Sequence, residues 1–114
     1  MSRILVTGGA GYVGSKLTVD LANQGHEVII YDTCFFGKEH IEENKNIKLI
    51  IGDIRDKIKF ENAVGGCETV IHLACISNDP SFNLNEELSK SINFDCFEDL
   101  VSISKKSGVK KFIY

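Results

Sequence analysis

The sequence lacks any apolar stretch long enough to cross a membrane. Its longest nearly unbroken apolar run is VIHLACI, whereas a transmembrane helix needs about 20 apolar residues. The N-terminus also lacks a charged region followed by the apolar core of a signal peptide. We therefore expect a cytoplasmic protein with no membrane partner.

An excess of positive charge is absent as well. The net charge is −3, which gives no electrostatic reason to expect a nucleic-acid partner. The content of 43% hydrophobic and 25% charged residues is that of an ordinary soluble globular protein. The length of 114 residues fits a single domain over residues 1–114, and no repeat or linker divides it.

Paired cysteines are also missing. Cys34, Cys67, Cys75 and Cys96 are widely spaced, with no C-x-x-C pair and no clustered histidines, so we expect no metal site. In a cytoplasmic protein they are expected to be reduced thiols. Cys75 and Cys96 lie within apolar patterns and are interpreted as small core residues rather than nucleophiles.

Apolar runs of strand length alternate with longer stretches of helical period. The runs are RILVT, EVIIYD, IKLII, TVIHLA and KKFIY. They are continuous in Val, Ile and Leu, as expected for strands of a parallel sheet that is covered on both faces. The pattern predicts an α/β fold: a Rossmann-like, doubly wound, mostly parallel sheet of about five strands with helices on both faces.

Two helices have clear sequence features. The first carries Val13, Leu17 and Leu21 at four-residue steps, the spacing of the apolar face of an amphipathic helix, and Gly25 follows as a stop. A longer helix is expected to begin at the cap residue Asn85.

Glycines are concentrated in VTGGAGYVGSK, near the start of the chain. Gly9-x-Gly11-x-x-Gly14 directly follows a predicted strand and opens a predicted helix, which is the context of a dinucleotide-binding loop. Such glycines allow a sharp turn, close approach of a pyrophosphate and tight packing of helix on strand. The alternatives are a tight turn without a ligand, or a phosphate loop. The phosphate loop fits poorly because the chain has Ser15-Lys16 where that motif has Lys followed by Ser or Thr.

The second predicted strand ends in Asp32, about 20 residues beyond the glycines, where a dinucleotide fold places an acid against the ribose hydroxyls. A carboxylate at this position repels a 2′-phosphate, so NAD is favoured over NADP. The alternative is a loop acid without a ligand.

Five motifs occur together in one order. They are Thr7-Gly8-x-x-Gly11-x-x-Gly14, then YD, GDIRD, VIHLAC and SINFD. With them the chain resembles the N-terminal part of an extended short-chain dehydrogenase/reductase of the NAD-dependent nucleotide-sugar epimerase/dehydratase family. The segment HLACISNDPS is similar to the UDP-glucose 4-epimerase-like branch. The resemblance covers essentially the whole chain.

The resemblance implies an NAD site built from several segments. The pyrophosphate cradle would comprise Gly8, Gly11, Tyr12, Val13 and Gly14, and the ribose would be bound by Asp32 and Thr33. The adenine would be held by Asp53 and Ile54, and the nicotinamide side of the site would be lined by Leu73, Ala74, Cys75, Ser77 and Asn93. Simpler interpretations are a turn-forming Asp53, a surface Asn93, and a hydrogen-bonded core histidine at His72.

The family's reaction needs a tyrosine base whose pKa is lowered by a neighbouring lysine, in a Tyr-x-x-x-Lys pair. Tyr12 and Lys16 have that spacing but overlap the glycine turn, whereas the family's pair follows the fifth strand. The chain ends at Tyr114, so we expect no catalytic residue and no nucleotide-sugar-binding region within it. The resemblance is compatible with a homodimer of the complete protein.

These observations predict the NAD-binding half of an epimerase or dehydratase whose complete form acts on a nucleotide sugar, while residues 1–114 alone are inactive. Two alternatives belong to other classes: a non-catalytic, NAD-sensing module and an FAD-dependent oxidoreductase.

Overall fold

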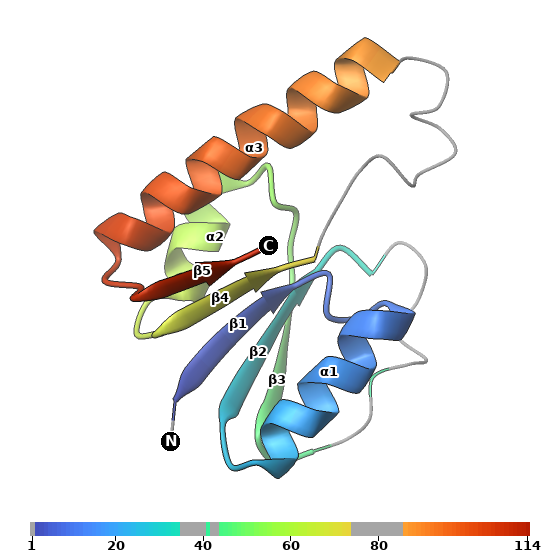
Figure 1. Ribbon diagram of the computed structural model, residues 1–114, viewed down its shortest axis with the longest axis vertical. Coiled ribbons are helices and arrows are strands. Elements are labelled where there is room, and N and C mark those ends of the chain that lie inside the picture. The colour runs from blue at the N-terminus through green and yellow to red at the C-terminus, as the bar shows by residue number, and fades with distance from the viewer. Residues whose placement is uncertain (1, 35–40, 42–43, 74–85) are drawn as a thin grey trace.

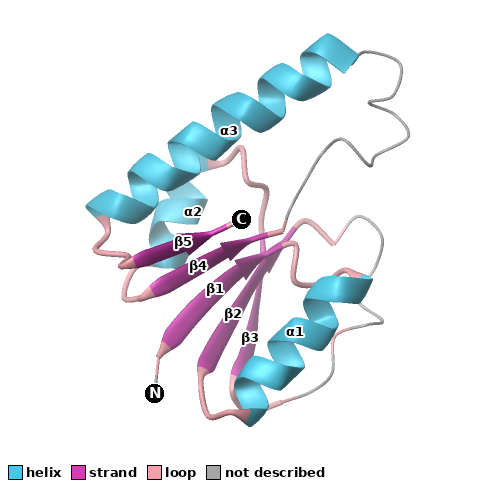
Figure 2. Cartoon of the chain, viewed as in Figure 1, coloured by secondary structure: helices cyan, strands magenta, loops and turns pink. Residues whose placement is uncertain are grey.

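A computed structural model of the chain describes residues 2–34, 41, 44–73 and 86–114, with only the backbone at residues 12 and 86–95. Five strands form one parallel sheet in the order β3-β2-β1-β4-β5 (Figures 1 and 2). The strands are β1 (Arg3–Thr7), β2 (Glu27–Asp32), β3 (Ile47–Ile51), β4 (Thr69–His72) and β5 (Lys111–Ile113). The helices are α1 (Tyr12–Asn23), α2 (Lys57–Val64) and α3 (Glu86–Lys106). The predicted Rossmann-like fold is confirmed.

The order of the strands reverses at β1. The chain builds outward from β1 through β2 to β3, then returns to place β4 on the other side of β1. Val6 of β1 is therefore in register with Ile30 on one side and with Ile71 on the other. In open parallel sheets, ligands bind at the carboxyl ends of the strands where the order reverses. The fold thus directs attention to the carboxyl ends of β1 and β4.

Helices cover both faces of the sheet. Figure 1 shows α1 on one face and α2 and α3 on the other. Alternate residues of each strand supply two separate cores, because successive side chains of a strand point to opposite faces. The core beneath α1 contains Ile4, Val6, Ala22 and Val28. The larger core beneath α2 and α3 includes Leu5, Ile29, Tyr31, Phe60, Val64, Val70 and Leu100.

Only part of the apolar row that the sequence predicts for α1 packs onto the sheet, where Leu21 contacts the core beneath this helix. Val13, the first member of that row, is 69% exposed, while Ser15, Thr18 and Ala22 are buried. The reason is close packing: a Cβ at Gly14 would lie 2.5 Å from the Gly8 carbonyl oxygen. A helix that approaches the loop this closely presents small residues to it, so the larger side chain of Val13 remains outside.

The larger core is built around two aromatic rings. Phe60 of α2 and Tyr31 of β2 are fully buried, and their rings meet edge to face at a centroid distance of 5.7 Å. This geometry is one of the favoured arrangements for aromatic pairs. The contact fixes α2 to the strand that carries Asp32 at its end. Within the part of the chain that the structure describes, no helix is long and apolar enough to span a bilayer.

Candidate cofactor-binding site

The loop between β1 and α1 contains glycines that the fold itself requires. Gly8 has a φ of 74°, a conformation that other residues adopt at a cost, and its N–H donates to the Tyr31 carbonyl over 2.9 Å. At Gly9, a Cβ would lie 3.0 Å from the Ile30 side chain, and at Gly14 it would collide with loop backbone. These three glycines are explained by turn geometry and close packing alone.

Gly11 is different, because none of the described residues requires a glycine there. It is exposed, and its φ of −74° and ψ of 177° lie in the extended region that any residue adopts. Among the residues that the structure describes, a Cβ at Gly11 would meet only the Gly8 carbonyl oxygen, at an ordinary contact distance of 3.6 Å. The space at Gly11 is therefore not filled by the described part of the chain, as a cradle for a ligand would require.

The N-terminus of α1 faces this space without a side-chain cap. Gly11 is its N-cap and, as a glycine, provides no side-chain acceptor for the amides of the first turn. The first helical bond runs from the Ser15 N–H to the Gly11 carbonyl, over 2.9 Å. In contrast, α2 is capped by Asp56, which accepts from the Lys59 N–H over 3.1 Å. Uncapped amides and the helix dipole together favour an anion, such as a phosphate group, at the start of α1.

Asp32, at the end of β2, touches the glycine loop. Its Oδ2 accepts from the Ala10 N–H over 3.0 Å, and its Oδ1 accepts from the Cys34 N–H over 2.8 Å. A carboxylate offers about four acceptor positions, so two hydrogen bonds leave it able to accept from the hydroxyls of a ribose. Thr33, the other predicted ribose residue, follows directly and is half-buried.

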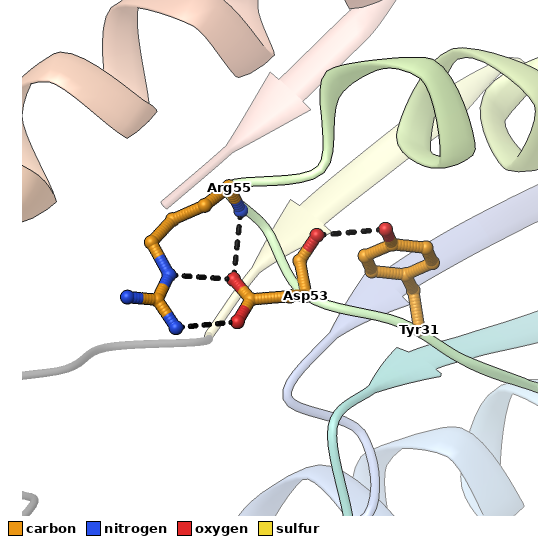
Figure 3. A network of polar contacts seen from close by, with 3 residues as sticks. All are labelled: Tyr31, Asp53 and Arg55. Atoms are coloured by element: carbon orange, nitrogen blue, oxygen red, sulfur yellow. Dashed lines mark hydrogen bonds and ion pairs between the residues drawn. The ribbon is translucent and has the colours of Figure 1, made fainter.

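The segment after β3 carries Asp53, held at both its main chain and its side chain (Figure 3). The Tyr31 hydroxyl donates to the Asp53 carbonyl over 2.8 Å. The Arg55 guanidinium donates to both carboxylate oxygens, at 3.0 and 2.7 Å. These hydrogen bonds lower the pKa of Asp53, while burial, followed by the charges of Asp56 and Asp53, raises the pKa of Tyr31 to about 12.

Ile54, predicted beside Asp53 at the adenine, has its side chain in the core beneath α2 and α3. It is 7% exposed. Only its backbone is therefore placed to contribute to a site at the edge of the sheet.

The end of β4 is joined to the end of β1. The Leu73 N–H donates to the Thr7 carbonyl over 3.0 Å and lies 3.2 Å from the Thr7 hydroxyl. That hydroxyl lies 2.6 Å from Nδ1 of His72, and the His72 ring also packs against Phe97 and Phe112. Burial lowers the pKa of His72. This environment agrees with the interpretation of His72 as a core histidine.

The predicted site residues that the structure describes in full lie at the carboxyl ends of four neighbouring strands. These residues are Gly8, Gly11, Val13, Gly14, Asp32, Thr33, Asp53, Ile54 and Leu73. Tyr12 begins α1, and Asn93 belongs to α3. Ala74, Cys75 and Ser77 lie outside the described residues. The segments are joined directly, because Asp32 binds the loop through Ala10 and accepts from the Gly52 N–H through its carbonyl.

Three contributors were not selected by the sequence analysis. Ala10 contributes only a backbone N–H, and an alanine carries no side-chain signal for that role. Thr7 belongs to the glycine motif, but its hydrogen bond to His72 joins residues 65 positions apart. Arg55 lies within GDIRD, two positions after Asp53. This spacing could have predicted their ion pair, because an arginine two positions after an acid can reach back to its carboxylate.

Across the described part of the chain, no group of three or more His, Cys, Asp or Glu residues is arranged to hold a metal ion. The site instead combines an open glycine, an uncapped helix N-terminus and an acid at the end of the next strand. On a parallel sheet of order 3-2-1-4-5, this combination defines a dinucleotide-binding domain of the Rossmann-like class.

Comparison with known proteins narrows this class to a family. Residues 4–114 match the NAD dependent epimerase/dehydratase family. The chain belongs to this family, and the match favours NAD over the FAD alternative.

Relatives in this family carry out different reactions. A 3-beta-hydroxysteroid dehydrogenase of Mycolicibacterium neoaurum is 31% identical over 100% of this chain and 31% of its own length. A UDP-N-acetyl-alpha-D-glucosaminuronate decarboxylase of Bacillus cytotoxicus is 36% identical over 98% of this chain and 35% of its own length. The structure of the epimerase Mth375 of Methanothermobacter thermautotrophicus matches with a TM-score of 0.89 and 33% identity, over 99% of this chain and 34% of that one. The chain thus spans about a third of the length of each of these relatives.

Proposed function

We propose that this chain binds NAD and forms the cofactor half of an enzyme that acts on a nucleotide sugar. The observation that carries the proposal is the open space at Gly11. It lies at the uncapped start of α1 and beside a loop that Asp32 holds through Ala10. The family is NAD-dependent, and the chemistry of these donors and acceptors fits the two ends of such a cofactor.

Each group of the site fits one part of the dinucleotide. The amides of residues 12–14 would bind the pyrophosphate, where the helix dipole favours negative charge. The Asp32 carboxylate would accept from the ribose hydroxyls, and the exposed side chain of Val13 would cover the cofactor. When bound, NAD supplies an acceptor for a hydride from the substrate. This chain's own residues bind and orient it.

The nucleotide sugar is proposed because one relative's name specifies a UDP-sugar derivative and one solved neighbour is an epimerase. The steroid dehydrogenase among the relatives shows that a similar cofactor half also occurs beside another substrate class. The choice of substrate is therefore determined by residues other than the glycine loop and Asp32.

The charge of Asp32 predicts a preference for NAD. We expect the protein to bind NAD at least about tenfold more tightly than NADP, since a carboxylate here repels a 2′-phosphate. Replacing Asp32 with asparagine should reduce the ratio of the two dissociation constants, measured by calorimetry. Asp32 also accepts from the Ala10 N–H, so its replacement can weaken the binding of both dinucleotides. The ratio of the NADP to the NAD dissociation constant is therefore more informative than either constant alone.

Glu27→Gln provides the matched control, because Glu27 is the exposed acid at the other end of the same strand. That variant should leave the ratio unchanged. Equal or tighter binding of NADP by the unmodified protein would exclude the proposed role of Asp32.

A protein of these 114 residues is expected to bind NAD without turning over a nucleotide sugar. Tyr12 has the spacing of a catalytic pair with Lys16, but it is the first residue of α1, within the proposed pyrophosphate cradle. A missing general base costs about 10²–10⁴-fold in rate, and missing substrate orientation costs up to about 7–11 kcal/mol in the barrier. The assay incubates the protein with NAD and UDP-, GDP- and dTDP-sugars and monitors epimer, 4-keto product or NADH. Turnover that disappears in Tyr12→Phe would identify Tyr12 as catalytic after all.

A further inference from the structure

His72 links the carboxyl ends of two neighbouring strands, β1 and β4 (Figure 2). It is in register with Thr7, the last residue of β1, and its Nδ1 lies 2.6 Å from the Thr7 hydroxyl. The Leu73 N–H donates to the Thr7 carbonyl over 3.0 Å and also lies 3.2 Å from that hydroxyl. Thr7, which is fully buried, therefore contacts both residues at the end of β4.

One arrangement of hydrogens satisfies both contacts of the Thr7 hydroxyl. The Leu73 N–H can only donate, so it uses one acceptor position of the Thr7 oxygen. The hydroxyl hydrogen is then directed to Nδ1 of His72, which accepts it when the ring is neutral and carries its proton on Nε2. A charged histidine donates from both ring nitrogens. The neutral ring accepts from Thr7, and the charged ring cannot.

The rest of the ring's surroundings disfavours a positive charge. His72 packs against Phe97 of α3 and Phe112 of β5, with a centroid distance of 6.1 Å to each. Burial lowers the pKa of His72 below its ordinary value of 6.5. The lower pKa keeps the ring in the neutral form that accepts from Thr7.

The described charged and titratable groups on or beside these packed elements do not offset this effect of burial. They are Arg3 on β1, Glu98 and Asp99 on α3, and Lys111 and Tyr114 at β5. Arg3 pairs with Glu27 at the other end of the sheet, and Asp99 pairs with Lys57 over 3.2 Å. The remaining three are exposed. None of them contributes to the pKa of His72.

We propose that His72 is a positioning residue that makes NAD binding sensitive to pH, because its neutral ring aligns the ends of β1 and β4 through the Thr7 hydroxyl. Thr7 directly precedes the glycine loop, and Leu73 directly follows His72, so a shift between the two strand ends moves both segments of the proposed site. The proposal rests on the proposed function, because the ligand is the NAD bound there. His72 acts through Thr7 and need not touch the cofactor.

The direction of the effect follows from the lowered pKa of His72. The link to Thr7 is complete above about pH 6.5, and it is lost as the pH falls through the lower pKa of the folded protein. Acid therefore favours forms in which the strand ends separate and the charged ring is solvated. Both the affinity for NAD and the free energy of unfolding should fall on acidification.

The test measures the dissociation constant of NAD by calorimetry between about pH 8 and about pH 5, the range in which histidine changes charge. In the unmodified protein this constant should rise by about fivefold or more, within the limit of about tenfold per pH unit for one proton. His72→Asn keeps an acceptor near the place of Nδ1 but does not titrate, so its constant should rise by less than about twofold. Thr7→Val removes the donor and should weaken binding already at about pH 8.

His26→Asn is the matched control. His26 is also half-buried, and its Nδ1 accepts from the Ser2 N–H over 3.3 Å, at the amino end of the sheet. This variant should keep the full dependence of NAD binding on pH. Circular dichroism checks that all variants remain folded. NMR of the imidazole nitrogens in the unmodified protein should show the proton of His72 on Nε2 at neutral pH.

The outcomes separate the two proposals. If the unmodified protein binds NAD equally at all pH values, or if His72→Asn keeps the same dependence on pH, the positioning role is wrong and the proposed function stands. A proton on Nδ1 of His72 at neutral pH would also exclude the role, because the ring could not accept from Thr7. If the unmodified protein binds NAD at no pH, both proposals fail.

Discussion

Replacing Gly11 with valine should weaken NAD binding by on the order of a hundredfold or more, while the chain remains folded. Among the described residues, a Cβ at Gly11 meets only the Gly8 carbonyl oxygen, at 3.6 Å, and the backbone angles suit valine. The added methyl groups would instead occupy the space that a pyrophosphate needs against the backbone. Calorimetric titration with NAD measures the loss. The free energy of unfolding should fall by about 1 kcal/mol, the typical effect of changing a helix N-cap residue.

Gly65→Val is a matched control for this substitution. Gly65 is also exposed, has a φ of −57°, and would place a Cβ 3.7 Å from the Asn62 carbonyl oxygen. It follows α2, at the amino end of the sheet and away from the proposed site. Normal NAD binding by the Gly11 variant would show that the glycine loop is a turn without a ligand. Equal losses in both variants would indicate a general effect of valine on the fold.

Replacing Phe60 with alanine should have the largest effect on stability. The ring is fully buried and meets Tyr31 edge to face, and truncation of such a residue costs about 3–5 kcal/mol. Typical domains are stable by about 5–15 kcal/mol, so a large part of the total would be lost. Denaturation by urea, followed by circular dichroism, measures the change in the free energy of unfolding.

Ile58→Ala on the same helix tests whether this cost comes from the core. Ile58 is 75% exposed, so its truncation should change stability by less than about 0.5 kcal/mol. A loss below about 1 kcal/mol for Phe60→Ala would contradict the packing of α2 onto β2 described above.

The strands could be predicted from sequence because their apolar runs are short and bounded by turns. RILVT, EVIIYD and IKLII coincide with β1, β2 and β3 to the residue. The exposed position of Val13 could not be predicted from periodicity, since the contact between Gly14 and the Gly8 carbonyl, rather than the apolar row, sets the rotation of α1. Spacing identifies a candidate helix, but packing decides which of its faces is buried.

The candidate site could be predicted wherever it depends on residue type at a fixed place in the chain. Glycines after a strand and an acid at the end of the next strand are such features, and Gly11 and Asp32 lie at one edge of the sheet. Hydrogen bonds made by the backbone cannot be predicted from residue type, and the bond from the Ala10 N–H to Asp32 is an example. Ile54 illustrates the converse, because a residue named for a site has its side chain in the core.

The central place of β1 also has a consequence for the order in which the protein is synthesised. β1 is synthesised before the two strands that flank it, and it can pair with β2 after a separation of 24 residues. The other edge of β1 pairs with β4, whose His72 lies 65 residues beyond Thr7. Distant parallel pairing forms slowly and leaves unpaired strand edges exposed in the meantime. The nascent chain therefore carries an unpaired edge on β1, the central strand of this sheet, until β4 has emerged.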